Sequence, residues 1–493
     1  MNIMTVLGNV LAPMSLLWMN IGLAAGIIIG ALPGLTGTMG IALLLPLTYG
    51  MSSIHGMMLL LGVYCGGIYG GSITAILINT PGTPASAATC LDGYPMAQQG
   101  HAKRALHDAL AASMIGGLIS CIILLTCAPM VAKFALNFGA REYFALSLFG
   151  LTIIASVGGK SVLKGLLMGF AGLLLGCVGI DSLEGVSRFT FGNNYLTGGF
   201  NIIPVLIGLF AITEIMTKSR DINKAVGTTV AVEEEKVSFA DVLRYKIVLL
   251  KSSVIGAFIG AVPGTGAAIA SFLAYNEAHR TSKHPEEYGM GSEEGLVACE
   301  SSNNAVTGAT MIPLLTLGIP GDTNTAVLLG ALTMQGIQPG PMLFTKQANW
   351  VYSIMIGMVL INLFMYLQGR LFVRGFSNIT KISTKIMVPC LVVLCVIGAY
   401  AIKYNTFNAA AMVVIGVIGY LLKKLDFPLT PMVIGLVLGN LCESNMRRAL
   451  LLSRGNWLTF FQSPIACVFL ALAVFMLFFP MIRDALANKK KAE

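Results

Sequence analysis

Charged residues are scarce in this chain of 493 residues. Lysine, arginine, aspartate and glutamate together make up 11% of the sequence, whereas 56% of the residues are hydrophobic and the mean hydropathy is +0.80. Soluble domains carry roughly 25% charged residues, so this composition excludes an ordinary soluble domain and predicts a polytopic membrane protein. The net charge of +9 does not indicate a nucleic-acid-binding protein, because the basic residues stand in short clusters between apolar runs, as in cytoplasmic loops.

Metal ligands and catalytic groups are also few. The five histidines do not stand at a metal-ligand spacing from one another or from cysteine. The ten cysteines are scattered through apolar runs, where we interpret them as small packing residues. The sequence contains no GxSxG or HExxH motif and no pair of aspartates on one predicted helix. We therefore expect neither enzymatic activity nor a bound metal or organic cofactor.

The chain is rich in glycine and in long apolar runs, and several of these runs are interrupted. In residues 300–341 the apolar sequence is broken by the polar residues 301–304 and again by residues 318–325. A break inside the bilayer exposes backbone groups that lipid cannot satisfy, so it is tolerated only where protein or water surrounds it. The freed helix ends direct partial charges into the gap. We therefore expect a binding site for an ion or a carboxylate at these breaks.

The interruptions occur twice, in corresponding positions of two halves. At an offset of 230 residues, Gly26, Ile29, Gly30, Ala31, Pro33 and Gly34 match Gly256, Ile259, Gly260, Ala261, Pro263 and Gly264. At an offset of 239 residues, Pro81, Gly82 and Ala87 match Pro320, Gly321 and Ala326. Paired Gly/Pro interruptions of this kind indicate the binding site of a secondary transporter.

This repeat predicts the architecture. We expect an all-α polytopic membrane protein of about 12 spans, with two inverted repeats, broken or re-entrant helices and an elevator-like mobile domain. The first half covers residues 1–216, a hydrophilic linker covers residues 217–246, and the second half covers residues 247–493. The basic clusters of the C-terminal part do not agree on one orientation, so the sides of the termini stay open.

The four interruptions supply hydroxyl and amide side chains, Thr38 and Ser86 among them, but no lysine or arginine. A carboxylate bound there must be neutralised by helix N-termini and by co-bound cations, so a sodium ion or a proton is the expected coupling ion. The alternative is that these small polar residues only pack helices together. The predicted substrate-binding residues are Pro33, Gly34, Thr36, Asn79, Thr80, Pro81, Gly82, Thr83, Pro263, Gly264, Thr265, Asn303, Asn304, Pro320, Gly321, Thr323, Asn324 and Thr325. The candidate cation ligands are Glu300, Ser302, Asn303 and Asp322.

Two of these candidates are acidic, and each has more than one interpretation. Glu300 is either a proton or cation ligand, as intramembrane acids commonly are, or a helix cap at the membrane interface. Asp322 ligates sodium, is protonated during transport, or caps the helix that follows residues 320–325, since aspartate is a favoured N-cap.

Three stretches carry a resemblance to a known family. They read LPGLTGTMGIALLLPLTYGM, YGGSITAILINTPGTPASAATCLDGYPMAQQG and ESSNNAVTGATMIPLLTLGIPGDTNTAVLLGALTMQGIQPGP. The chain resembles the large membrane subunit (TctA) of the tripartite tricarboxylate transporters. It differs from the family pattern at Asp322, Thr323 and Asn324, where small neutral residues are usual, and at Cys299, where a proline is usual. These differences leave the identity of the carboxylate open.

The resemblance implies a multi-pass protein of the bacterial inner membrane that imports a tricarboxylate or dicarboxylate by symport with sodium or protons. It also implies a small membrane subunit similar to TctB and a periplasmic substrate-binding protein similar to TctC. Membrane lipids are the other expected contacts, and no nucleic acid is expected. A channel-like anion pore is the alternative, although the polar breaks are confined to the two repeats rather than spread along one span.

Overall fold

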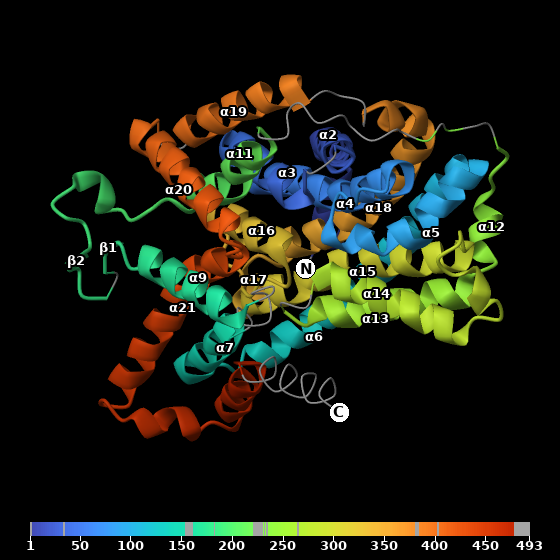
Figure 1. Ribbon diagram of the computed structural model, residues 1–493. Coiled ribbons are helices and arrows are strands. Elements are labelled where there is room, and N and C mark those ends of the chain that lie inside the picture. Colours follow the sequence, from blue (N-terminus) through green and yellow to red (C-terminus); the bar gives the residue numbers. More distant parts are fainter. Residues whose placement is uncertain are drawn as a thin grey trace, which may run out of the picture. The chain divides into compact units, whose positions relative to one another are not determined.

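Helices make up almost all the regular structure of this chain in a computed structural model (Figure 1). The structure describes residues 2–32, 35–152, 161–181, 183–219, 230, 232, 235–263, 266–379, 384–401 and 404–477. Within these residues the only strands are β1 (Gly179–Ile180) and β2 (Ser187–Arg188), which form a small antiparallel hairpin in which Gly179 pairs with Arg188. The chain is therefore an all-α protein, as the repeat of interrupted helices predicts.

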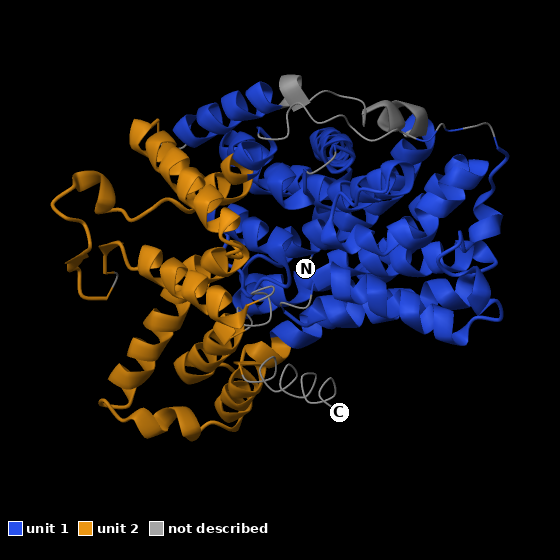
Figure 2. Ribbon diagram, in the orientation of Figure 1, with its two compact units in different colours: residues 1–132, 214–402 blue, residues 133–213, 403–493 orange. Residues whose placement is uncertain are grey.

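The chain divides into two compact units (Figure 2), of which unit 1 comprises Met1–Ala132 and Glu214–Ile402. Its main helices are α1 (Ile3–Leu11), α2 (Pro13–Gly30), α3 (Gly37–Leu44), η1 (Leu45–Gly50), α4 (Ser53–Ile78), η2 (Pro84–Ala87), α5 (Thr89–Met96), η3 (Ala97–His101) and α6 (Ala102–Ala135), whose last turn passes the unit boundary. They continue with α11 (Thr213–Ser219), α12 (Phe239–Leu243), α13 (Lys246–Ala261), α14 (Gly266–Thr281), η6 (Pro285–Glu287), α15 (Glu293–Leu317), α16 (Thr323–Met334), α17 (Pro341–Lys346), α18 (Ala348–Ile379) and α19 (Thr384–Ala401).

Unit 2 comprises Lys133–Thr213 and Lys403–Glu493. It contains the β-hairpin and the helices α7 (Ala140–Thr152), α9 (Val162–Gly176), η4 (Asn194–Leu196), α10 (Ile202–Leu206), η5 (Ile207–Ile212), α20 (Thr406–Lys424), α21 (Thr430–Leu452), η7 (Trp457–Phe461) and Pro464–Leu477. Each unit thus combines two segments that are separate in the sequence. The predicted halves, residues 1–216 and 247–493, are a division of the sequence into two repeats, and this division stays a prediction.

The helices are interrupted where the Gly/Pro pairs predict it. Residues 31–36 separate α2 from α3, and residues 262–265 separate α13 from α14. The later interruptions each follow a long helix that ends in a left-handed residue, Asn79 (φ 51°) after α4 and Gly318 (φ 72°) after α15. We call residues 79–83 the first tip and residues 318–322 the second tip. The predicted residues Pro33, Gly34, Gly264 and Thr265 lie outside the described residues.

One predicted interruption was wrong. Residues 301–304 do not break a helix, because α15 runs without a break from Glu293 to Leu317. Serine and asparagine reduce helix propensity by well under 1 kcal/mol each. Here their side chains are also buried within the protein, and the Ser301 hydroxyl donates to the Ala298 carbonyl one turn earlier. The helix therefore continues, and these polar groups point from its surface toward neighbouring helices.

The two repeats use the same close helix crossing. The helices α13, α14 and α15 lie side by side (Figure 1), and α2 packs along α4 as α13 packs along α15. A Cβ atom on Gly26 would lie 2.5 Å from the Val63 carbonyl oxygen, and one on Gly256 would lie 2.3 Å from the Ser302 carbonyl oxygen. Glycine at these positions lets the helix backbones touch, which is how membrane helices commonly associate.

The two repeats also pack against each other. The helix α3, which follows the first Gly/Pro interruption, packs against α16, which follows the second tip. In the same way α14, which follows the second Gly/Pro interruption, packs against η2, which follows the first tip. This reciprocal packing is what a pseudo-two-fold relation between the repeats would produce.

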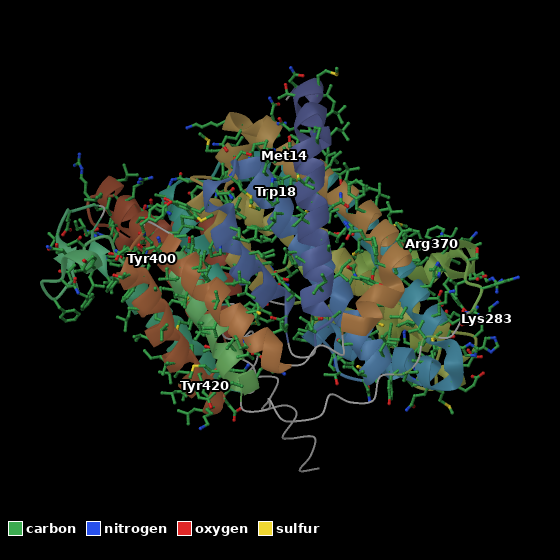
Figure 3. All side chains as sticks on the ribbon, turned by 90° about the horizontal axis from the view of Figure 1, so that it is seen from above. Met14, Trp18, Lys283, Arg370, Tyr400 and Tyr420 are labelled. Carbon is green, nitrogen blue, oxygen red and sulfur yellow. The ribbon has the colours of Figure 1, made fainter. Side chains whose placement is uncertain are left out.

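The outer surface of the helices is apolar. Met14 is 48% exposed on α2, where Trp18 also lies (Figure 3), and Ile247, Phe258 and Leu371 are more than half exposed on other helices of unit 1. Within the described residues six helices are long and apolar enough to cross a membrane, namely Pro13–Gly30, Ser53–Ile78, Thr89–Ala135, Ile202–Ser219, Ala348–Phe372 and Thr406–Lys424. Shorter apolar helices accompany them. The chain is therefore an all-α polytopic membrane protein, and the total of about 12 spans stays a prediction.

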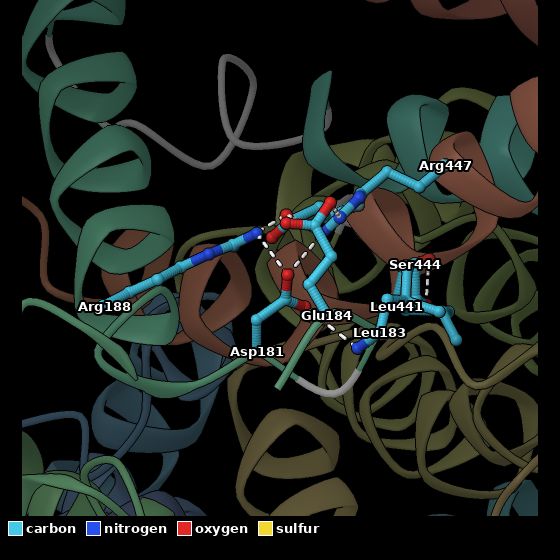
Figure 4. Close-up of polar contacts among 8 residues, drawn as sticks. Asp181, Leu183, Glu184, Arg188, Leu441, Ser444 and Arg447 are labelled. Carbon is cyan, nitrogen blue, oxygen red and sulfur yellow. Dashed lines mark hydrogen bonds and ion pairs between the residues drawn. The ribbon is translucent and has the colours of Figure 1, made fainter. Parts of the chain in front are cut away.

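In unit 2, a cluster of ion pairs fastens the β-hairpin to α21 (Figure 4). Arg188 of β2 pairs with Asp181 at 2.8 Å and with Glu443 of α21 at 2.7 Å. Arg447 of α21 pairs with Asp181 at 2.6 Å and also with Glu184. The hydrogen bond from Arg447, with help from the backbone and from Arg188, lowers the pKa of the Asp181 carboxyl below its ordinary value of 3.8.

This pKa shift predicts a pH dependence of the hairpin. Because the folded form of Asp181 has the lower pKa, the attachment is fully present above pH 4 or so and is lost as the pH falls through the lowered value. The protection factors of the amides of residues 179–181 and 183–188, which compare each exchange rate with the intrinsic rate at the same pH, should be high at pH 7 and should fall selectively at pH 3. Asp181→Asn is the control, and its hairpin should have low protection factors at both pH values. Equal protection of the wild-type hairpin at both pH values would contradict this.

Candidate functional site

The second tip is closed by a capping box at the start of α16. The backbone N–H of Thr325 donates to Oδ1 of Asp322 at 2.8 Å, and the Thr325 hydroxyl accepts from the Asp322 N–H at 2.9 Å. Asp322 therefore has the geometry of an N-cap, the position that stabilises a helix by typically about 1 kcal/mol. One of the three interpretations of Asp322 thus has direct structural support.

The other carboxylate oxygen of Asp322 joins the second tip to the first repeat. Its Oδ2 accepts from the Tyr64 hydroxyl at 3.1 Å and from Asn324 Nδ2 at 3.2 Å. The Tyr64 hydroxyl also lies 3.0 Å from the hydroxyl of Thr310 on α15. Asn324 in turn accepts from the Thr38 hydroxyl of α3 at 2.6 Å. This hydrogen-bonded group, Thr38, Tyr64, Thr310, Asp322 and Asn324, is called the tip network below.

The tip network contains both predicted and unpredicted residues. Thr38, Asp322 and Asn324 come from the interruptions that the sequence singles out. Tyr64 and Thr310 were missed, because each is an isolated hydroxyl in the interior of a helix with nothing local to mark it. The available signal was that Tyr64 stands in the middle of an apolar run, where a buried hydroxyl requires a partner.

The first tip is more open than the second. Asn79, Thr80 and Pro81 are exposed, whereas Gly82 and Thr83 are buried. The Gly82 N–H donates to the Gly71 carbonyl at 3.2 Å, which holds the tip against α4. Thr83 caps η2, and its hydroxyl pairs with that of Ser86 at 2.9 Å. Among the described residues no hydrogen bond joins the two tips.

The remaining predicted site residues at the interruptions lie at several different positions. Thr36 caps α3, where its hydroxyl accepts from the Met39 N–H at 3.3 Å. Pro320 and Gly321 are buried in the second tip, and Thr323 is half-buried at the first position of α16. Pro263 is half-buried in the turn that follows α13. The structure therefore brings the second tip and the start of α3 together, and no hydrogen bond in the described residues adds Thr36, Pro263 or Thr323 to the tip network.

A second polar cluster surrounds Glu300 in the interior of α15. Glu300 has no exposed surface and lies two turns into the helix, so the interpretation of Glu300 as a helix cap was wrong. Its carboxylate accepts from the hydroxyl of Thr89 on α5 and from that of Ser113 on α6, the latter at 3.1 Å. Asn304 Nδ2 donates to the Ser113 hydroxyl at 2.7 Å. We call Thr89, Ser113, Glu300 and Asn304 the Glu300 cluster.

Several polar atoms next to the Glu300 cluster have no partner in the structure. The Ser302 hydroxyl, both amide atoms of Asn303 and the Asn304 Oδ1 are buried and make no hydrogen bond. Leaving a buried polar group unpaired costs roughly 1–3 kcal/mol. Because these residues were predicted as substrate or cation ligands, a bound ligand or ion is one way in which they would be satisfied.

The sequence of this chain matches a known protein family. The Tripartite tricarboxylate transporter TctA family matches residues 16–434. The chain belongs to the TctA family. An "Uncharacterized 52.8 kDa protein in TAR-I ttuC' 3'region" of Agrobacterium vitis is 39% identical over 464 residues, which cover 94% of this chain and 92% of that protein.

A second relative, an "Uncharacterized protein in TAR-II ttuC' 3'region" of Agrobacterium vitis, is 36% identical over 232 residues, 46% of this chain and 96% of that protein. No solved structure matches this chain. As a member of the TctA family, the chain is a component of a tripartite tricarboxylate transporter.

For this TctA-family protein, Asp322→Asn tests the role of the acidic residue in the second tip. Asparagine still accepts from the Thr325 N–H as an N-cap but carries no charge. If capping is the function, the variant keeps near-normal uptake with unchanged sodium and pH dependence. Asp322→Ala is the matched comparison and should lose about 1 kcal/mol of helix stability. A marked loss of sodium affinity, or a shifted pH optimum, in Asp322→Asn would instead place Asp322 in the coupling site.

Proposed function

We propose that this chain is the large membrane subunit of a secondary active transporter that imports carboxylate anions into a bacterial cell across the inner membrane. A cation gradient drives the uptake, and the substrate is a di- or tricarboxylate. The small membrane subunit is similar to TctB, and a periplasmic binding protein similar to TctC delivers the substrate. The observation that carries the proposal is the tip network, which joins the interruption of one repeat to the tip of the other.

The chemistry of the interruptions supports an anionic substrate together with a cation. The second tip and the start of α3 offer helix N-termini, hydroxyls and amides, and their residues include no lysine or arginine. A helix N-terminus contributes roughly half a positive charge, which is too little to balance two or three carboxylates. A co-bound cation supplies the difference. Glu300, Ser302, Asn303 and Asp322 are the residues that we propose for cation binding.

The arrangement of unit 1 supports movement of the site. The close crossings of α2 with α4 and of α13 with α15 make each repeat a tightly packed body, while the tips lie at helix ends. We propose that these elements move together as the elevator-like part of the transporter, carrying the tip residues from one side of the membrane to the other.

The test is uptake of labelled di- and tricarboxylates by cells that carry this chain with both proposed partners, with sodium present or replaced by choline, at several pH values. Saturable uptake that stops when the ion gradient is collapsed supports the transporter. A channel-like anion pore is the alternative, and it would give conductance that does not saturate and does not need a cation gradient. Omission of either the binding protein or the small subunit should abolish uptake.

A further inference from the structure

We propose that Glu300 is the residue that carries a coupling proton through the membrane, at a site separate from the tip network. This inference rests on the proposed function, because it names the coupling ion of that transporter and the group that binds it. It follows from the burial of Glu300, from the directions of its hydrogen bonds, and from an acceptor arrangement that suits the protonated acid.

Glu300 is a buried acid without a counter-charge. Its side chain is fully covered, and no described lysine, arginine or histidine forms an ion pair with it. An isolated carboxylate in a low-dielectric interior is strongly disfavoured, so such a group either pairs with a cation or takes up a proton. Acids of this kind inside a membrane domain are usually functional.

The hydrogen bonds around Glu300 have defined directions in the ionised form. Asn304 Nδ2 donates to the Ser113 hydroxyl at 2.7 Å, so the Ser113 proton is directed to the carboxylate, 3.1 Å away. The Thr89 hydroxyl donates to the other carboxylate oxygen. Both oxygens therefore receive a hydroxyl proton, which is the arrangement that an ionised carboxylate prefers.

The same residues can accept the protonated form after one hydroxyl rotation. The Cys299 thiol can donate to the Leu296 carbonyl at 3.2 Å or to the Thr89 hydroxyl at 3.9 Å. When it donates to the carbonyl, its sulfur can accept from Thr89. When Glu300 binds a proton, its O–H donates to the Thr89 oxygen and the Thr89 O–H turns to the Cys299 sulfur. The proton comes from the aqueous phase, so one O–H bond breaks in hydronium, one forms on Glu300, and none breaks elsewhere in the cluster. Neither state leaves a hydroxyl proton of the cluster without an acceptor.

The surroundings contain few other groups that could hold the proton. The titratable groups that interact with Glu300 or its neighbour Cys299 are Tyr69 of α4, Cys90 and Asp92 of α5, and Tyr275 of α14. The Oδ1 of Asp92 accepts from three backbone N–H groups of residues 289–292, which fix this carboxylate in place, whereas its Oδ2 is buried and makes no hydrogen bond. The helices α6 and α13 contribute no charged partner to Glu300 in the described residues. Of these two acids, Glu300 is the one held by rotatable hydroxyls rather than by fixed backbone N–H groups, so its hydrogen bonds can reverse when a proton binds.

The proton site and the tip network share one helix but not one proton path. Hydrogen bonds continue from the tip network along α15. The Thr310 hydroxyl donates to the backbone carbonyl of Thr307, and the Thr307 hydroxyl donates to the backbone carbonyl of Asn304. A backbone carbonyl accepts a hydrogen bond and cannot pass a proton on. Ten residues of helix separate Glu300 from Thr310, a rise of about 15 Å. We infer that the proton and the substrate are coupled because α15 carries both sites through the same movement.

The experiment compares Glu300→Gln with the wild type in proteoliposomes that contain this chain and both proposed partners. Glutamine imitates the protonated acid: its Nε2 donates to Thr89 and its Oε1 accepts from Ser113. The variant should therefore lose accumulation of labelled carboxylate against a gradient while keeping exchange of internal for external substrate. In the wild type, a pH-sensitive dye should report proton entry with each burst of uptake, and the variant should show none. Glu286→Gln, at a side chain that is 70% exposed, is the matched control and should behave as the wild type.

Thr89→Val provides a second readout that loss of folding would not give. The valine removes both the donor to the ionised carboxylate and the acceptor of the protonated acid, and the bond to the ionised form is the stronger of the two. The acid should therefore release its proton less readily, and the pH at which uptake declines should shift upward. Normal accumulation and pH dependence in Glu300→Gln, or entry of ²²Na⁺ without protons in the wild type, would overturn the inference and leave the transporter proposal standing. Absence of saturable uptake in the wild type would overturn the proposed function itself.

Discussion

Gly26→Leu is expected to prevent stable assembly of the first repeat. A Cβ atom at this position would lie 2.5 Å from the Val63 carbonyl oxygen and 2.8 Å from the Val63 Cα. Both are backbone atoms of α4, which cannot move aside as the end of a side chain could, so α2 and α4 must separate along their crossing. Overpacking commonly costs about 1–3 kcal/mol, and we expect the upper end or more here, because in a membrane close packing is itself the attraction between helices.

The measurement is the yield and thermal stability of the variant in detergent, followed by size-exclusion chromatography. Gly8→Leu is the matched control, because a Cβ atom on Gly8 in α1 has no neighbour within 4 Å. It should change stability by less than about 0.5 kcal/mol, as surface substitutions usually do. Gly256→Leu should reproduce the effect in the second repeat, where the Ser302 carbonyl oxygen lies 2.3 Å from the added Cβ atom. If Gly26→Leu and Gly256→Leu were both as stable as the wild type, the helices at the two crossings would have to lie farther apart than they do in the structure.

The positions of the helix interruptions could be predicted because their causes are local. Proline lacks a backbone N–H and fixes its own φ, and glycine tolerates the left-handed backbone that ends a helix. The ends of α2, α4, α13 and α15 therefore follow from a few residues each. The repeat supported this interpretation, since two matched interruptions are stronger evidence than one. The same local reasoning failed at residues 301–304, where polarity was interpreted as a break although serine and asparagine are compatible with a helix.

The contacts of the site could be predicted only in part. Thr38, Asp322 and Asn324 were named because they stand at interruptions. Their partner Tyr64 is separated from Asp322 by 258 residues, and which helix faces which depends on tertiary packing that no local pattern encodes. The cluster around Glu300 shows the same limit. Glu300 itself stands out as an acid in an apolar stretch, whereas Thr89 and Ser113 are single hydroxyls on other helices that nothing in the sequence links to it.

Gly321→Val is expected to abolish uptake while the protein remains in the membrane. The reason is a close approach rather than an unusual backbone angle, because Gly321 is not among the described glycines with positive φ. A Cβ atom on Gly321 would lie 2.8 Å from the Thr310 Cβ and 3.0 Å from its Cα, which are rigid parts of α15. The tip must therefore move away from Thr310, and the bond of Thr310 to Tyr64 and that of Tyr64 to Asp322 cannot both be kept.

The measurement is carboxylate uptake normalised to the amount of protein in the membrane, with Gly321→Ala and Gly50→Val alongside. Alanine adds the same Cβ atom without further methyl groups, so its uptake should be intermediate. A Cβ atom on Gly50 meets nothing within 4 Å, so Gly50→Val should transport normally. Overpacking at the tip costs about 1–3 kcal/mol, which should leave the rest of unit 1 folded. Uptake should therefore fall by more than the amount of protein in the membrane does. Normal uptake by Gly321→Val would show that the second tip is an incidental kink and that substrate does not bind there.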